Sequence, residues 1–211
     1  AFCTVHGNEG NVGSCRQRRR QEPAFRSDQI DPTRIGVLGF SWGGVMSLAA
    51  AEQTYAGMFG QGLQFAAHVA HYPVCYGANN EAILENLPNP LPFPITPDVA
   101  DTQFLALTGA PVLIQIGTED DYDNGAEPCL TIADQLVDPD DAELVEVEVY
   151  EGAYHAWDRL QVPVSALDPF GDLGSYLEDP LNNPVPTVEI VPDVDQAYES
   201  RREVVKFFKD T

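Results

Sequence analysis

Residues 34–56 read RIGVLGFSWGGVMSLAAAEQTYA, and two kinds of pattern meet within this stretch. Residues 34–40 are a short apolar run that predicts a buried strand, whereas residues 41–56 have the Ala-rich composition of a helix that packs closely on a sheet. The junction is a G-x-S-x-G sequence from Gly39 to Gly43. A serine flanked by small residues between a strand and a helix is typical of a sharp, strained turn that exposes its hydroxyl, so Ser41 is a candidate nucleophile.

Predicted strands and helices alternate on either side of this junction. We expect strands at residues 65–72, 111–117 and 144–150, and helices at residues 128–137 and 195–209. The alternation predicts an α/β fold, with a mostly parallel sheet and helices on both faces. The last of the three strands alternates apolar and acidic residues, as an outer strand does. With 211 residues, 44% of them hydrophobic, the chain is expected to form a single domain over residues 1–211.

Residues 73–110 and 158–194 interrupt the alternation. Both segments are rich in proline and show no clear periodicity. Long irregular stretches inside a compact domain are commonly lids or binding loops. We therefore expect both segments to be loop insertions that form the walls of a pocket.

The charge of the chain excludes several classes of partner. Its formal net charge is −22 and its pI is about 4.2. Nucleic acids and anionic lipid surfaces bind positively charged proteins, so neither is an expected partner. The basic run at residues 16–20, RQRRR, is interpreted as an exposed helix face. No apolar run is long enough for a membrane span, and a small molecule remains the expected partner.

The candidate acid and base follow two of the predicted strands. Glu119, Asp120, Asp121 and Asp123 come directly after residues 111–117, and His155 comes shortly after residues 144–150. Catalytic groups of open α/β sheets gather at the carboxyl ends of strands. A serine nucleophile needs a base and an orienting carboxylate, and the order Ser, acid, His is that of the fold with a G-x-S-x-G turn.

The remaining histidines and the cysteines give no metal-binding pattern. His68 and His71 are three apart on a predicted strand, which places them on opposite faces, so both are interpreted as structural. The acidic run at residues 119–123 departs from the spacing of a calcium-binding loop. None of the four cysteines forms a C-x-x-C pair, so a zinc site is not expected, and free thiols and disulfides both remain open.

An H-G-x-x-G sequence lies near the start of the chain, at residues 6–10, after a short apolar run. A glycine-rich loop after a strand can direct backbone N–H groups at a developing oxyanion. Gly7 and Asn8 are therefore candidate oxyanion donors, and a simple glycine turn is the alternative.

Three blocks of sequence together resemble the dienelactone hydrolase family of the α/β-hydrolase fold. The blocks are IGVLGFSWGG, PVLIQIGTEDD with Cys129 shortly after it, and VEVYEGAYHAWD, and the resemblance covers about residues 31–157. It implies Ser41 as nucleophile, Asp120 as acid and His155 as base. It also implies the Trp42 backbone N–H as one oxyanion donor, with the loop at Gly7 and Asn8 supplying the second. No cofactor or metal is implied.

The chain departs from the family in two respects. The narrow family uses a cysteine nucleophile, and the serine here indicates its esterase-like members. Between an H-G-x-x-G strand and the nucleophile strand the family has a helix, a strand and another helix, for which residues 15–34 are too few. Either this part of the fold is missing, or residues 1–15 belong to a different part of it.

The resemblance also bears on the cysteines and on location. The sequence Tyr72-Pro73-Val74-Cys75 matches a Tyr-Pro-x-Cys that often occurs in the family. Cys75 and Cys129 would then follow neighbouring strands, and a bridge between them is a hypothesis. The acidity and the possible bridge favour an exported protein, periplasmic or extracellular, over a cytoplasmic one.

These observations predict a serine hydrolase that cleaves a small carboxylic ester or lactone through an acyl-enzyme. Two alternatives remain open at this point. One is a non-catalytic binding protein of the same fold, and the other is an acyltransferase that uses the same three residues.

Overall fold

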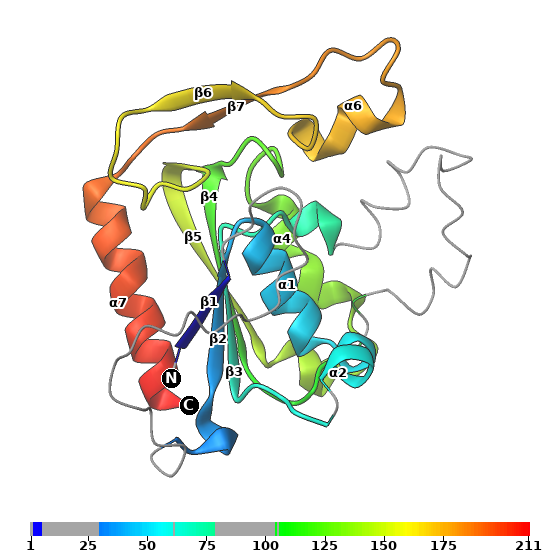
Figure 1. Ribbon diagram of the computed structural model, residues 1–211, viewed down its shortest axis with the longest axis vertical. Helices are drawn as coiled ribbons and strands as arrows, with labels where there is room; N and C mark the ends of the chain where they lie inside the picture. Colours follow the sequence, from blue (N-terminus) through cyan, green and yellow to red (C-terminus); the bar gives the residue numbers. More distant parts are fainter. Residues whose placement is uncertain (1, 6–29, 61, 79–103, 105) are drawn as a thin grey trace, which may run out of the picture.

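The computed structural model describes residues 2–5, 30–60, 62–78, 104 and 106–211. A five-stranded sheet lies at its centre in the order β1-β2-β3-β4-β5, and all neighbouring strands are parallel (Figure 1). The strands are β1 (Phe2–Val5), β2 (Gly36–Phe40), β3 (Ala67–His71), β4 (Val112–Glu119) and β5 (Val145–Tyr154). Helices cover both faces, which confirms the predicted α/β fold.

Burial explains why these segments form strands. All residues of β3 and the first six of β4 are buried, as expected for inner strands of a parallel sheet with both faces covered. β5 pairs with β4 at one edge, and its residues alternate between partly buried and exposed over Val145–Val147. The prediction of an outer strand here is confirmed.

The two faces of the sheet carry different helices. On one face lies α1 (Trp42–Ala51), whose Leu48 packs with Ile114 of β4. On the other lies α7 (Val194–Asp210), whose Val204 packs with Leu113 of the same strand. In Figure 1 the two helices flank the sheet on opposite sides. The bounds of α7 confirm the helix predicted at residues 195–209.

Two predicted helices are shorter or divided in the structure. The segment expected as one helix at residues 41–56 is α1 followed by α2 (Gln53–Phe59). They separate at Glu52, which is extended and whose carboxylate caps α2 by accepting from the Thr54 and Tyr55 N–H groups at 2.7 and 3.0 Å. The segment expected at residues 128–137 is divided into α4 (Glu127–Leu130) and η5 (Ile132–Gln135).

Short elements complete the described chain. They are η2 (Pro32–Arg34), η3 (Cys75–Gly77), α5 (Pro139–Ala142), η6 (Asp172–Gly174) and α6 (Ser175–Glu178). None of the described helices is long and apolar enough to cross a membrane.

The proline-rich segment at residues 158–194 contains regular structure that its sequence pattern does not indicate. β6 (Val164–Leu167) and β7 (Thr187–Ile190) form an antiparallel pair, which in Figure 1 lies above the carboxyl ends of β4 and β5. β6 is exposed throughout and so shows no alternation in burial, whereas β7 alternates between exposed and buried or partly buried residues, but over only four positions. Most of the other predicted loop, at residues 73–110, lies outside the described residues.

Candidate active site

Ser41 lies in a tight turn between β2 and α1. Its backbone has φ 54° and ψ −125°, a left-handed conformation that is strained for any residue other than glycine. The Ser41 N–H donates to the His71 carbonyl at 3.0 Å, and the Ser41 carbonyl accepts from Gly44 N–H at 2.7 Å. A Cβ atom at Gly39 would lie 1.7 Å from the Gly43 carbonyl oxygen. The chain therefore requires glycine at position 39 for the turn to close.

Asp120 directly follows β4 and is 1% exposed. Its Oδ1 accepts a hydrogen bond from Tyr122 N–H at 3.0 Å, and its backbone carbonyl accepts from Gly125 N–H at 2.9 Å. Both contacts lie within the turn that begins at this residue. They orient the carboxylate so that Oδ2 is available to another partner.

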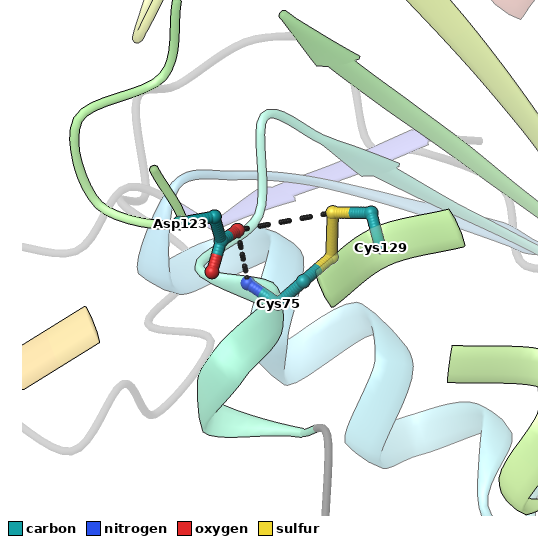
Figure 2. A group of neighbouring side chains, drawn as sticks. All are labelled: Cys75, Asp123 and Cys129. Carbon is teal, nitrogen blue, oxygen red and sulfur yellow. Dashed lines mark hydrogen bonds between the residues drawn. A yellow bond between two sulfur atoms is a disulfide. The ribbon is translucent and has the colours of Figure 1, made fainter. Parts of the chain in front are cut away.

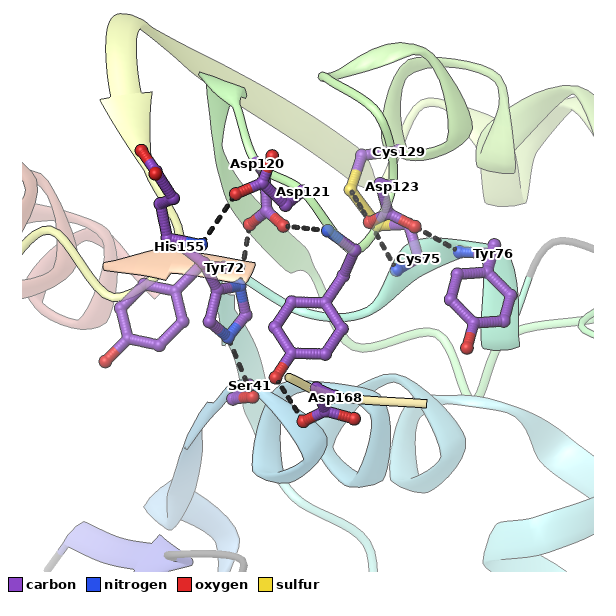
Figure 3. Close-up of polar contacts among 12 residues, drawn as sticks. Ser41, Tyr72, Cys75, Tyr76, Asp120, Asp121, Asp123, Cys129, His155 and Asp168 are labelled. Carbon is purple, nitrogen blue, oxygen red and sulfur yellow. Dashed lines mark hydrogen bonds and ion pairs between the residues drawn. A yellow bond between two sulfur atoms is a disulfide. The ribbon is translucent and has the colours of Figure 1, made fainter. Parts of the chain in front are cut away.

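His155 directly follows β5 and connects the other two residues. Its Nδ1 lies 2.7 Å from Asp120 Oδ2, and its Nε2 lies 2.9 Å from Ser41 Oγ (Figure 3). With an ionised carboxylate, Nδ1–H donates to Asp120 and Nε2 accepts from the Ser41 hydroxyl. The structure thus brings together the three residues that the sequence indicates, each one position beyond a parallel strand. We refer to them as the Ser41–His155–Asp120 row.

Two tyrosine rings enclose the imidazole of His155. The Tyr72 ring lies 5.0 Å from it at 67°, and the Tyr122 ring lies 4.4 Å from it at 55°. Burial raises the pKa of both phenols, so both hydroxyls act as neutral donors. Tyr72 donates to Asp158 Oδ1 at 2.7 Å, which holds its ring in place. Sequence reasoning missed both tyrosines, although Tyr72 also directly follows a parallel strand.

The other carboxylates of the acidic turn have different partners. Asp121 Oδ2 accepts from Glu189 N–H of β7 at 2.7 Å. Asp123 is 1% exposed and accepts from the Cys75 and Tyr76 N–H groups, both at 2.7 Å. Burial, with a smaller contribution from the Asp120 charge, raises the pKa of Asp123 well above its usual value. Of these acids, Asp120 is the one hydrogen-bonded to His155.

Cys75 and Cys129 form a disulfide that lies beside Asp123 (Figure 2). It joins η3, which follows β3, to α4, which follows β4, and so provides the bridge hypothesised from the sequence. Cys129 Sγ lies 3.8 Å from Asp123 Oδ2, but a disulfide sulfur has no proton to donate. The two sulfurs and the carboxylate are near enough to hold a metal ion. Because metals bind thiolates, the oxidised pair does not fit one.

His68 and His71 lie on opposite faces of β3, as their spacing predicts. His68 Nδ1 lies 3.0 Å from the Ser47 carbonyl of α1, and His71 Nδ1 lies 2.7 Å from Gln115 Oε1 of β4. Burial lowers the pKa of each to about 4. Both rings are therefore neutral at pH 7 and donate from Nδ1 to these oxygens.

The candidate oxyanion donors are described in part. The Trp42 N–H is the first of α1, next to Ser41, where an N-terminal amide has no partner within the helix. Gly7 and Asn8 lie outside the described residues. β1 ends at Val5, the register partner of Gly39, so the described part of the N-terminal segment pairs with the strand that precedes Ser41.

Comparison with solved structures gives distant matches. Esterase B from Lactobacillus rhamnosus has 12% identity and a TM-score of 0.49, with 85% of this chain and 53% of that chain covered. Thermogutta terrifontis esterase 2 has 15% identity and a TM-score of 0.49, with coverage of 85% and 55%. A putative dienelactone hydrolase from Klebsiella pneumoniae has 19% identity and a TM-score of 0.42, with coverage of 86% and 54%. The chain thus spans about half the length of the structures it matches.

Comparison with curated protein sequences finds no match. The model of the dienelactone hydrolase family matches residues 16–168, which include Ser41, Asp120 and His155 but not β1. This match extends over well more than half of the 211 residues. The chain therefore belongs to the dienelactone hydrolase family, within the α/β-hydrolase fold.

Proposed function

We propose that this protein is a serine hydrolase that cleaves a carboxylic ester of a small substrate. The observation that carries the proposal is the Ser41–His155–Asp120 row, in which hydrogen bonds of 2.9 and 2.7 Å join a strained serine to a base and the base to a buried acid. Membership of the dienelactone hydrolase family supports the same class of reaction. The proposed reaction uses side chains and water, with no cofactor.

In the first half-reaction, His155 Nε2 takes the proton of the Ser41 hydroxyl while Oγ attacks the ester carbonyl carbon. The carbonyl π electrons move to oxygen, which becomes the oxyanion of a tetrahedral intermediate. Asp120 stays ionised and stabilises the imidazolium through Nδ1–H. The intermediate collapses to the acyl-enzyme as the C–O bond to the alcohol breaks, and His155 gives its proton to the departing alkoxide.

In the second half-reaction, His155 takes a proton from water, whose oxygen attacks the acyl-enzyme carbonyl. The second tetrahedral intermediate collapses as the bond between Ser41 Oγ and the acyl carbon breaks, which releases the carboxylic acid, and His155 returns its proton to Ser41 Oγ. The Trp42 N–H, with Gly7 and Asn8 as further donors, would stabilise the oxyanion in both halves. Loss of one such donor costs about 100- to 1000-fold in kcat in a serine hydrolase.

Labelling with a fluorophosphonate, which reacts with activated serines, tests this proposal directly. We expect one adduct on the Ser41 peptide by mass spectrometry, and its loss in the His155→Ala variant. Asp121→Asn is the matched control, because Asp121 lies beside Asp120 but bonds to Glu189 instead of His155. An adduct that persists in His155→Ala, or folded protein without an adduct on Ser41, would contradict the mechanism.

A panel of simple esters then tests the reaction itself. We expect release of free acid in water with no added acceptor alcohol, and a decrease of about 10⁴-fold or more in kcat for Ser41→Ala. Turnover that requires an acceptor alcohol would identify an acyltransferase instead. Tight binding of an ester without turnover would identify a binding protein.

A further inference from the structure

Two exposed aromatic side chains meet beside the candidate nucleophile. Trp42 is the residue after Ser41, and Phe170 lies between β6 and η6. Their ring centroids are 5.2 Å apart and the rings are at 82°, an edge-to-face arrangement. The exposed fractions are 37% for Trp42 and 38% for Phe170. This aromatic pair therefore leaves apolar surface open to solvent, and one of its members directly follows the serine proposed to react.

Hydrogen bonds hold Phe170 in this position. Its carbonyl accepts from the Tyr76 hydroxyl at 3.0 Å, and its N–H donates to Asp168 Oδ1 at 2.9 Å. The other oxygen of Asp168 accepts from the Tyr122 hydroxyl at 2.8 Å. Since the Tyr122 ring lies against His155, Phe170 is connected to the Ser41–His155–Asp120 row through two side chains.

Backbone contacts fix the same segment to the turn after β4. Asp172 N–H donates to the Asp121 carbonyl and Leu173 N–H to the Tyr122 carbonyl, both at 2.8 Å. Independently of these two bonds, the side-chain and ring contacts given above, with the Ser41–Trp42 peptide bond, join six residues in a closed circuit that includes Ser41 and His155. Its members are, in order, Ser41, Trp42, Phe170, Asp168, Tyr122 and His155. A surface ordered before binding loses little conformational entropy when a ligand binds to it.

The charge near the aromatic pair is negative. Asp168 and Asp172 lie two residues before and two residues after Phe170, and Asp121 bonds to the adjacent β7. A carboxylate on the substrate would be repelled here, whereas an uncharged ring would bury apolar surface against Trp42 and Phe170.

We infer that Trp42 and Phe170 determine specificity by binding an uncharged aromatic group of the ester. That the ligand is an ester rests on the serine hydrolase function proposed above. That an aromatic group binds here rests on the Trp42–Phe170 pair alone. The ring of the ester packs against the pair while its carbonyl lies at Ser41. Esters with a ring are then preferred over small aliphatic esters, and rings that carry a carboxylate are disfavoured.

The test compares 1-naphthyl acetate with ethyl acetate, which share an acyl group, and ethyl 1-naphthoate with ethyl acetate, which share an alcohol. We expect Phe170→Ala to lower kcat/KM for one of the two naphthyl esters about tenfold more than kcat/KM for ethyl acetate. Phe170→Leu should lose less, because it keeps part of the apolar surface. Tyr198→Ala is the control, since Tyr198 is an exposed aromatic residue of α7.

A binding measurement separates this inference from the proposed function. Calorimetric titration of Ser41→Ala protein with 1-naphthol needs no turnover, and we expect about tenfold weaker binding when Phe170→Ala is added. Weaker binding on addition of Phe170→Ala, together with no fluorophosphonate adduct on Ser41 of the unchanged protein, would support the aromatic site and contradict the hydrolase. Equal binding with and without Phe170→Ala, or an equal loss of kcat/KM for ethyl acetate and both naphthyl esters, would overturn the inference.

Discussion

The Asp123 carboxylate accepts a 2.7 Å hydrogen bond from the backbone N–H of Cys75, so the turn that begins at Asp120 is attached to the segment after β3. The same carboxylate accepts from Tyr76 N–H at 2.7 Å, and the Cys75–Cys129 disulfide lies beside it. Figure 3 shows this cluster next to the Ser41–His155–Asp120 row. The position of the proposed acid therefore depends on a carboxylate that does not contact His155.

Asp123→Asn should destabilise the protein by about 1 to 3 kcal/mol, because an amide has one acceptor oxygen and leaves a buried N–H without its partner. Urea unfolding measures this change. The control is Asp134→Asn, which alters an exposed carboxylate of η5. An equal effect of the two substitutions would show that the backbone contacts of Asp123 contribute nothing to stability.

Reduction of the disulfide should lower stability by about 4 kcal/mol, the chain-entropy value for a loop of this length. The bridged cysteines are 54 positions apart, and both are fully buried. Unfolding of the Cys75→Ser, Cys129→Ser double variant, compared with the oxidised protein, provides the measurement. Intact mass with and without reductant under denaturing conditions should differ by two hydrogens, and equal masses would mean that no bridge is present.

Ser41→Gly should be more stable than Ser41→Ala by about 1 kcal/mol or more. Alanine keeps the Cβ atom that makes φ 54° unfavourable, whereas glycine adopts this conformation without that cost. Thermal unfolding of the two variants measures the difference. If Ser41→Ala proves at least as stable as Ser41→Gly, the turn does not store strain at this residue.

Stability should decrease as pH falls from about 6.5 towards 4, because His68 and His71 are buried in the neutral form. Their pKa values are lowered from 6.5 to about 4, so in this range the unfolded chain binds protons that the folded chain does not. Each histidine contributes about 3 kcal/mol to the free energy of unfolding, at 1.36 kcal/mol per pKa unit. This contribution is fully present above pH 6.5.

Asp123 changes the pH dependence of stability in the opposite direction. Its pKa is raised in the folded state, so its contribution is present at low pH and is lost as pH rises above the unfolded value of 3.8. Asp121 and Glu148, whose pKa values are also raised, act in the same direction as Asp123. We expect the net slope between pH 7.5 and 5 to follow the histidines, because their unfolded pKa of 6.5 lies within this range. Urea unfolding between pH 7.5 and 5 gives the slope, and His71→Asn should reduce it. A flat profile in the unchanged protein would refute the assignment.

Local sequence was sufficient for the elements that carry the site. Inner strands such as β3 and β4 are buried on both faces, so their apolar runs stand out, and the glycines around Ser41 mark a turn that side chains would block. The sequence also predicts that Ser41, the acidic turn and His155 lie close together. Each follows a parallel strand, and the carboxyl ends of parallel strands meet at one edge of the sheet.

The tertiary structure alone decided which side chains surround the row. Local pattern left four acids at or just after the end of β4 equivalent, and a hydrogen bond across 35 positions distinguishes Asp120 from the others. Tyr122, Phe170 and the strand β6 carry no periodic signal because they are exposed or lie in turns, and β7 alternates over only four residues. Their positions result from contacts between segments distant in sequence, and such contacts exist only after the chain has folded.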